Sequence, residues 1–277
     1  MDWLTPEDAG RLEPGISVDG VLAATFCAQD GIADPNGVTM GFARAAQDRG
    51  VEIVRGTEVT GIELSGRRVQ HVQTSAGRVA TPLVVNAAGP WASEIGRMVS
   101  LDVPVAPERR HIFIAQAPGG GSWDDGAHRG SVPADRIMVI DFESTFYFHR
   151  EGGGLLFGMG DPDERPGFDT TVRWDFLPQV IDVAVRRLPA LGDAAVSHAW
   201  AGLYEMTPDH NPIIGASSKV PGFYMVAGFS GHGFQHSPAA GRILADLITG
   251  QDPKFDVTPF APDRFAEAVV GGEANVV

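Results

Sequence analysis

The residues best suited to chemistry lie together between positions 200 and 241 of this 277-residue chain. Tyr204 comes first, and the run 228–234, Gly-Phe-Ser-Gly-His-Gly-Phe, directly follows an apolar, strand-like segment, 223–227. A helical pattern continues from Ala239 to Ile248. Glycines let the backbone approach a ligand, and a helix N-terminus offers free N–H groups and a positive dipole end. This order predicts a site for a flat, polar ligand, although an ordinary tight turn between strand and helix has the same pattern.

The usual cradle for a dinucleotide, a Gly-x-Gly-x-x-Gly loop after a buried strand, does not occur in the sequence. The triple glycines at 119–121 and 152–154 do not open a helix after such a strand. The first residues instead predict a helix, because Thr5 can cap it, Pro6 suits its first position and Glu7 and Asp8 suit its first turn. We expect the chain to be the later part of something longer.

The composition excludes several classes of protein. With 43% hydrophobic and 20% charged residues, the chain can bury a substantial core as one large domain or two smaller ones. A net charge of −14 argues against nucleic acid or an anionic membrane as a partner. Cys27 is the only cysteine, so an intramolecular disulfide is excluded, and no His, Asp and Glu set has metal-ligand spacing. We see no signal peptide and no apolar run of membrane-spanning length, which favours the cytoplasm.

The first third of the chain predicts a mixture of helices and strands. Asp34 and Pro35 begin a helix that passes through Phe42 and ends at Gly50. A short strand is expected at 51–54, followed by two strands, 58–64 and 69–74, joined by a hairpin turn at 65–67, with an edge strand at 78–81. A buried strand, 83–88, then leads through a turn of small residues into a helix through Ile95 and Met98.

From about Val103 the pattern changes to short strands separated by Gly, Pro and Asp clusters, which is typical of an antiparallel sheet. The expected strands are 111–116, 136–141, 146–150 and 155–159. A helix at about 176–188 follows, and a strand at 196–203 leads back to the glycine-rich run. After about Ala261 we expect a short helix and a polar, frayed end.

Four segments carry a resemblance to one family. They are 30–35, Asp-Gly-Ile-Ala-Asp-Pro; 84–91, Val-Val-Asn-Ala-Ala-Gly-Pro-Trp; 202–209, Gly-Leu-Tyr-Glu-Met-Thr-Pro-Asp; and the run 228–234. Together they resemble the D-amino-acid-oxidase-type FAD-dependent oxidoreductases, most closely the branch of the sarcosine oxidase beta subunit and dimethylglycine dehydrogenase, with glycine oxidase more distant. The resemblance extends from about Leu4 to Gly250. One such motif would be weak, whereas four in order are specific.

The resemblance implies a mixed α/β fold with two parts. Residues 31–100 and 201–255 would form an incomplete FAD-binding, Rossmann-like domain. Residues 1–30 and 101–200 would form a substrate domain built on an antiparallel or mixed sheet. Residues 256–277 would be a C-terminal tail.

The resemblance also implies roles for individual residues. Val59 would reach the adenine end of FAD, and the turn with Ala87, Ala88, Gly89 and Trp91 would pack on the cofactor. The residues expected along the flavin ring and ribityl chain are Gly228, Ser230, Gly231, His232, Gly233, Phe234 and Gln235. Tyr204 would face the substrate, and Tyr204, His232 and Arg150 are the candidate catalytic residues. We add Arg150, at a strand end, as a cation for a substrate carboxylate, with a surface ion pair as the alternative.

Three positions depart from the small monomeric sarcosine oxidases. Gly202 stands where those enzymes attach the flavin covalently through cysteine, and Leu156 stands where a lysine activates oxygen. Gln235 replaces the lysine that binds the substrate carboxylate. A dehydrogenase or a different substrate is therefore as well supported as an oxidase. The basic run 109–111 could bind an anion, but its residues favour a solvated strand edge.

The expected function is oxidation of the C–N bond of a small amine or amino acid, of the sarcosine, dimethylglycine, glycine or proline type, by hydride transfer to FAD. A partner subunit or a homo-oligomer is expected from apolar surface left without a covering segment. The alternative is a truncated, non-catalytic relative that acts as a subunit or binding protein without stable FAD. A nicotinamide dehydrogenase is disfavoured because no second dinucleotide site is visible.

Overall fold

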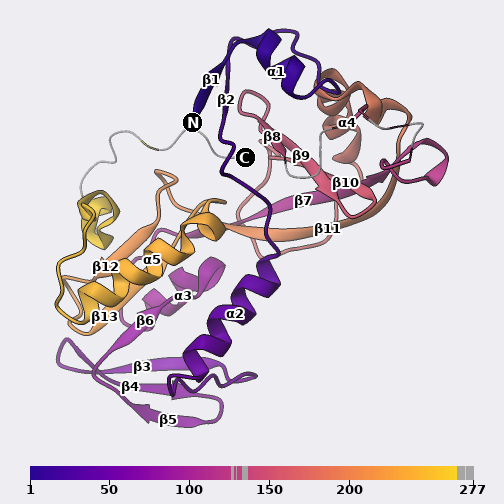
Figure 1. Cartoon of the computed structure of the whole chain (residues 1–277). Helices are drawn as coiled ribbons and strands as arrows, with labels where there is room; N and C mark the ends of the chain where they lie inside the picture. Colours follow the sequence, from indigo (N-terminus) through magenta and orange to yellow (C-terminus); the bar gives the residue numbers. More distant parts are fainter. Residues whose placement is uncertain (126–127, 129, 133–136, 267–271, 273–277) are drawn as a thin grey trace.

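The computed structural model describes residues 1–125, 128, 130–132, 137–266 and 272, which form two lobes (Figure 1). Two long strands, β7 (Ala106–Gln116) and β11 (Ala195–Met206), extend from one lobe toward the other. One lobe holds the largest sheet and α4 (Leu177–Arg187), and the other holds α2 (Pro35–Gln47), α3 (Ala92–Arg97) and α5 (Gly233–Ile248). The mixed α/β fold predicted from the sequence is confirmed.

The largest sheet is antiparallel, in the order β11-β7-β10-β9-β8. Its remaining strands are β8 (Met138–Asp141), β9 (Phe146–Glu151) and β10 (Gly154–Met159), close to the predicted ranges. Because β7 pairs with both β10 and β11, it is an interior strand. The prediction of a solvated edge at 109–111 is therefore wrong: Arg109, Arg110 and His111 are only 8%, 9% and 1% exposed.

The alternation of side chains divides this sheet into two faces. One face carries a cluster of buried aromatic rings, Phe113, Phe146, Phe148 and Phe157, which packs with α4 to form the lobe's core. On the other face, the register places Tyr147, Gly158, Ile112 and Trp200 in one row across β9, β10, β7 and β11. The second face is turned away from α4.

The second lobe is organised around a small mixed sheet. Strand β13 (Phe223–Ala227) pairs antiparallel with β12 (Ile213–Ala216) and parallel with β6 (Val84–Asn86). The predicted meander is confirmed as β3 (Val59–Ser65), β4 (Arg68–Thr74) and β5 (Gly77–Ala80). Apolar side chains from both sheets and α3, including Ile62, Val69, Ala92, Ile213 and Phe223, form a continuous core.

Helix α5 begins at Gly233, six residues before the predicted start at Ala239. Pro238 lies inside the helix and has no N–H to donate to the preceding turn. The Ser237 hydroxyl donates to the carbonyl of Phe234 at 2.9 Å, which is the carbonyl that Pro238 leaves without its helical donor. The side chain next to the proline thus compensates for the break and lets the helix start at the glycine-rich turn.

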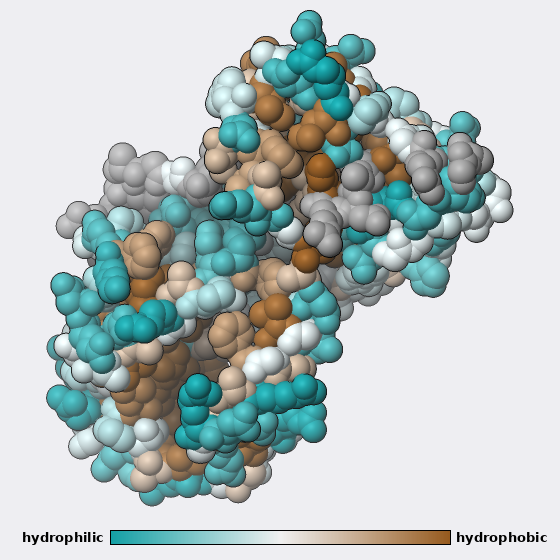
Figure 2. All heavy atoms as spheres, in the orientation of Figure 1, coloured by the Kyte–Doolittle hydropathy of each residue, from teal (hydrophilic) through white to brown (hydrophobic). Residues whose placement is uncertain are grey.

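Helix α2 has the predicted Asp34 cap, whose carboxylate accepts the N–H groups of Asn36 and Gly37. It has no buried residue, and Phe42 is 58% exposed. The strand predicted at 51–54 is wrong: this segment is irregular and exposed, because no described strand pairs with it. Figure 2, drawn in the orientation of Figure 1, shows apolar residues gathered on the visible face of the lobe that carries α2 and α5.

The remaining elements, at the start of the chain and between the larger ones, are short. Helix α1 (Pro6–Leu12) has the predicted Thr5 cap, completed by Asp8 as a capping box, and β1 (Asp2–Leu4) pairs with β2 (Ala24–Phe26). Short 3₁₀ turns complete the chain: η2 (Pro118–Gly120), η3 (Pro189–Asp193), η4 (Thr258–Phe260) and η5 (Pro262–Ala266). Most of the polar end predicted beyond η5, and Arg136 of the predicted strand 136–141, lie outside the described residues.

Within the described ranges, no helix combines the length and apolar character needed to cross a membrane. The same residues contain no group of three or more His, Cys, Asp or Glu side chains placed to hold a metal ion.

One ion pair fastens η5 to the loop between β11 and β12. The guanidinium of Arg264 binds Asp209 in a bidentate manner, at 2.7 and 2.9 Å, and also donates to the carbonyl of Asn211 at 2.7 Å. Burial raises the pKa of Asp209, but the hydrogen bonds from Arg264 and from the Asn211 N–H outweigh it, so the pKa lies below its ordinary value. Asp209 and Asn211 therefore hold η5 against this loop.

We predict that Asp209→Asn lowers the free energy of unfolding by about 3 kcal/mol, because Arg264 loses its counter-charge in a buried pair. The stabilisation from a lowered Asp pKa is present above the ordinary value of 3.8 and is lost as the pH falls through the folded pKa. Urea unfolding from neutral to acidic pH should therefore show a smaller difference between wild type and variant at the acidic end. The exposed Asp252→Asn is the control, and a difference that stays constant over the whole range would contradict the assignment.

Candidate functional site

Asn86, at the end of β6, shapes the turn that follows. Its side chain is 2% exposed; the amide donates to the carbonyl of Ala92 at 2.9 Å and the oxygen accepts the N–H of Ala88 at 3.3 Å. These two bonds bridge the short 3₁₀ helix η1 (Gly89–Trp91). The turn therefore presents Gly89 and Pro90 toward β11.

The loop after β13 is fixed to the end of β11 by Ser230. This residue is fully buried with φ +50°, and its hydroxyl accepts the N–H of Thr207 at 3.2 Å. Its own N–H donates to the carbonyl of Glu205 at 3.2 Å. The side chain of Ser230 thus faces β11, so only its backbone remains to line a ligand site.

A cavity of about 260 Å³ lies where η1, the end of β11 and this loop meet. Its walls are Gly89, Pro90, Leu203, Tyr204, Glu205, Phe229, Gly231 and Gly233. Helix α5 begins at this cavity, and within the described part of the chain no side chain caps its N-terminus. Its first N–H groups and the positive end of its dipole can therefore stabilise a polar or anionic ligand edge.

Gly231 brings the loop into contact with Tyr204. Its φ is +97°, and a Cβ added there would lie 2.5 Å from Cε2 of the Tyr204 ring. Only glycine allows both this backbone conformation and this approach. Tyr204 is therefore held between the loop and the sheet, and burial raises the pKa of its hydroxyl.

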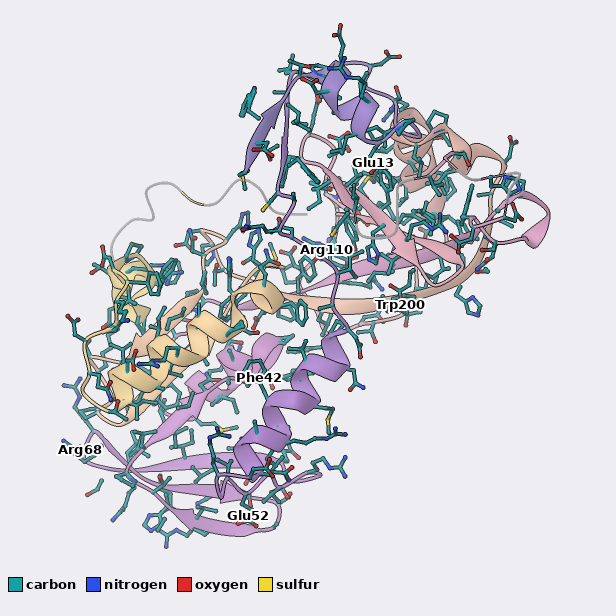
Figure 3. The ribbon with its side chains drawn as sticks, viewed as in Figure 1. Glu13, Phe42, Glu52, Arg68, Arg110 and Trp200 are labelled. Atoms are coloured by element: carbon teal, nitrogen blue, oxygen red, sulfur yellow. The ribbon has the colours of Figure 1, made fainter. Side chains whose placement is uncertain are left out.

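Arg110 lies next to Tyr204, with its guanidinium carbon 5.0 Å from the ring centroid. Figure 3 places Arg110 where the two lobes meet, with Trp200 further along the sheet. Both terminal nitrogens lie 3.4 Å from the Glu108 carboxylate, and one donates to the carbonyl of Arg109 at 3.1 Å. The Nε of Arg110 is buried and has no hydrogen-bond partner among the residues that the structure describes. Arg110 therefore keeps donor capacity that these residues do not use.

Tyr147 completes a polar cluster on the same face. A Cβ at Gly158 would lie 2.5 Å from the Tyr147 hydroxyl, so Tyr147 lies flat across β10 at a position where only glycine leaves room. Burial raises the pKa of Tyr147, the nearby Tyr204 raises it further, and Arg110 opposes the change. Arg110, Tyr147 and Tyr204 thus form one cluster of a cation and two neutral phenols beside the cavity.

Arg150 lies elsewhere. On β9 it alternates with Tyr147, so it lies on the face of Phe146 and Phe148, in the core beneath α4. Its guanidinium pairs with Asp124. The structure therefore does not bring Arg150 together with Tyr204, and Arg110 is the guanidinium that lies beside the Tyr204 ring. The sequence did contain a signal, because alternation along the strand places Arg110 on the same face as Ile112 and Ile114. The pairing of the strand was needed to decide which face of the sheet that is.

The structure brings only part of the other predicted residues to the cavity. Gly89, Gly231, Gly233 and Tyr204 line it, and Gly228, His232, Phe234 and Gln235 belong to the same loop and first helical turn. Ala87, Ala88 and Trp91 flank Gly89, and Trp91 stacks on Phe168 with ring centroids 5.4 Å apart. Val59 lies in the meander, where it packs against the second core rather than in the cavity wall. Arg110, Tyr147 and Glu205 were not predicted.

Comparison with known proteins agrees with this geometry. The family model described as FAD dependent oxidoreductase matches residues 1–247. Mitochondrial sarcosine dehydrogenase of Mus musculus is 31% identical over 274 residues, which cover 95% of this chain and 29% of that protein. The hydrogen cyanide synthase subunit HcnC of Pseudomonas aeruginosa is 28% identical, covering 95% of this chain and 60% of that protein.

A solved structure gives the same result at the level of the fold. The L-proline dehydrogenase from P. horikoshii superposes with a TM-score of 0.85 at 34% identity, covering 96% of this chain and 68% of that one. The chain belongs to the FAD dependent oxidoreductase family. It spans less than a third of the length of the sarcosine dehydrogenase it matches.

The residues present fit one end of FAD. The cavity has a backbone wall of glycines and a helix N-terminus that no described side chain caps. It also has the carboxyl oxygen Oε2 of Glu205, which is buried without a partner among the described residues. These features suit the polar edge of a flat ring.

We predict that Gly231→Ala lowers the free energy of unfolding by about 1–2 kcal/mol, the cost of a left-handed backbone for a residue with a Cβ, and displaces Tyr204. Urea unfolding measures the first effect, and the near-ultraviolet circular dichroism of tyrosine reports the second. Gly241→Ala in α5 is the matched control: its Cβ would meet nothing within 4 Å, so it should be neutral or stabilising. Equal stability of the two variants would contradict the role of Gly231.

Proposed function

We propose that this chain binds FAD and oxidises the C–N bond of a small amine or amino acid. The observation that carries the proposal is the meeting of η1, the end of β11 and the 228–234 loop around one cavity, directly beside Arg110, Tyr147 and Tyr204. Membership of the FAD dependent oxidoreductase family supports the cofactor. The printed names of the relatives support substrates of the sarcosine or proline type.

FAD would be held by backbone groups. The loop with Gly228, Ser230, Gly231 and Gly233 and the first turn of α5, with His232, Phe234 and Gln235, would follow the ring, and Gly89 in η1 would close the opposite wall. When bound, FAD supplies a two-electron acceptor for a hydride. The N–H groups and dipole of α5 favour negative charge at the ring edge beside them.

The substrate would lie against the sheet. Arg110 would attract a carboxylate through the charge of its guanidinium, and the Tyr147 and Tyr204 hydroxyls, kept neutral by their raised pKa values, would donate hydrogen bonds. Ile112 and Trp200, in the same row of the sheet, would give the substrate apolar neighbours. In this arrangement Arg110 takes the role expected of Arg150, and Tyr204 keeps its predicted role.

The division into an FAD-binding part, 31–100 and 201–255, and a substrate part, 1–30 and 101–200, is part of this proposal, as is the adenine-side role of Val59. A partner subunit or a second copy is supported by the exposed apolar residues of α2 and the 51–54 segment. The name of HcnC, a synthase subunit, is consistent with such an assembly for that relative.

The visible absorption spectrum tests the proposal. We expect the purified chain to bind added FAD, and sarcosine or proline to bleach the bound flavin in the absence of oxygen. A chain that gains no flavin absorption after incubation with FAD and gel filtration would contradict the proposal. That result would favour the alternative of a non-catalytic binding protein or subunit.

A second experiment tests the substrate side. We predict that Arg110→Met raises KM for a carboxylate-bearing amine by about 10–100-fold, since a charge-assisted hydrogen bond contributes about 1.5–3 kcal/mol. KM for an amine without a carboxylate should change little. The exposed Arg186→Met on α4 is the control. Equal KM values for the carboxylate substrate in wild type and Arg110→Met would show that the anion is bound elsewhere.

A further inference from the structure

Glu205 places a carboxyl group in the wall of the cavity. One oxygen, Oε1, accepts the N–H of Phe229 at 3.3 Å. The other, Oε2, is buried and has no hydrogen-bond partner among the described residues. A carboxylate oxygen buried in this way loses its hydration without compensation, which is unfavourable for the charged form.

The position of Oε2 connects it to the turn opposite. A Cβ added to Gly89 would lie 3.5 Å from this oxygen. Glu205 therefore contacts both walls of the cavity. Its Oε1 and its backbone carbonyl bind the 228–231 loop, and its Oε2 faces η1. A ligand between the two walls would cover the carboxyl group further.

Among the described residues, no cation forms an ion pair with Glu205. The elements around it carry several other titratable side chains: Glu108, Arg109, Arg110 and His111 on β7, His198 and Tyr204 on β11, and His236, Arg242 and Asp246 on α5, which follows His232; η1 has none. Arg109, on the same register face as Glu205, is held by Glu164 and Asp169. Arg110 contacts Glu108 and the Tyr204 ring instead. Burial raises the pKa of Glu205, and the N–H groups of Gly228 and Phe229 oppose that change only in part.

A flat ring that fills the cavity would replace the water in it and lower the effective dielectric constant around this carboxylate. The charged form would then be destabilised further, and the neutral acid would be favoured. The same direction follows from the chemistry of the ring, because a ring that accepts a hydride gains negative charge, and a carboxylate beside it would repel that charge.

We propose that binding of FAD in this cavity is coupled to the uptake of a proton by Glu205, so that the ring lies beside a neutral carboxylic acid. The proton comes from solvent, and Oε2 becomes an O–H donor. This inference rests on the proposed function and assigns Glu205 a role in cofactor binding, distinct from its hydrogen bonds to the loop.

Titration calorimetry with FAD tests the coupling without measuring catalysis. At one pH, in two buffers with different ionisation enthalpies, wild type should take up as much as about one proton per FAD bound. There is a pH range in which Glu205 is charged in the free chain and neutral in the complex. Within that range, FAD affinity should fall by up to about tenfold for each unit by which the pH rises. In Glu205→Gln, which is neutral at every pH, both effects should be reduced by the contribution of this one group.

The controls separate the possible outcomes. Glu94→Gln, at an exposed position of α3, should behave as wild type. If Glu205→Gln takes up as many protons as wild type, the inference is wrong and the proposed function stands. If wild type binds no FAD, both are wrong. Should Glu205→Gln fail to fold, the infrared difference spectrum of wild type with and without FAD decides: a new carbonyl band of a protonated carboxyl supports the inference, and its absence overturns it.

Discussion

The hydrogen bonds between Ser230 and the end of β11 are the constraint on which the site depends. The hydroxyl of Ser230 accepts from Thr207 and its N–H donates to Glu205, so the glycine-rich loop has one position relative to the strand. That position sets the contact of Gly231 with Tyr204, and thereby the distance between the sheet and the first turn of α5. The buried Asn86 does the same for the facing turn. Two short polar side chains thus determine the width of the cavity.

Much of the fold could be predicted from the sequence because its signals are local. The caps at Thr5 and Asp34, the hairpin at 65–67 and the alternating strands of the large sheet all depend on neighbours within a few residues. Two local predictions failed for reasons outside the segment. The 51–54 run has strand-forming residues but no paired strand, and α5 passes Pro238 because Ser237 replaces the missing donor.

The site was predictable only in part, since motifs identify a loop but not which side chains reach it. The 228–234 run and Tyr204 were found because they occur as contiguous patterns. Arg110 was missed because its burial depends on β7 being an interior strand. Pairing with β10 and β11 decides that position, and the local sequence does not reveal it. Arg150 was chosen as a cation near a strand end, yet its parity on β9 directs it to the core. One residue of register separates the two faces and so decides which arginine lies beside Tyr204 and which lies on the face of the aromatic core.

The continuity of β11 limits how the two lobes can move. The strand is paired with β7 along most of its length, and its last residues, Tyr204 to Met206, carry the cavity wall. A hinge between the lobes would have to bend this ladder and break backbone hydrogen bonds in series. Rigid-body opening of the two lobes is therefore mechanically stiff.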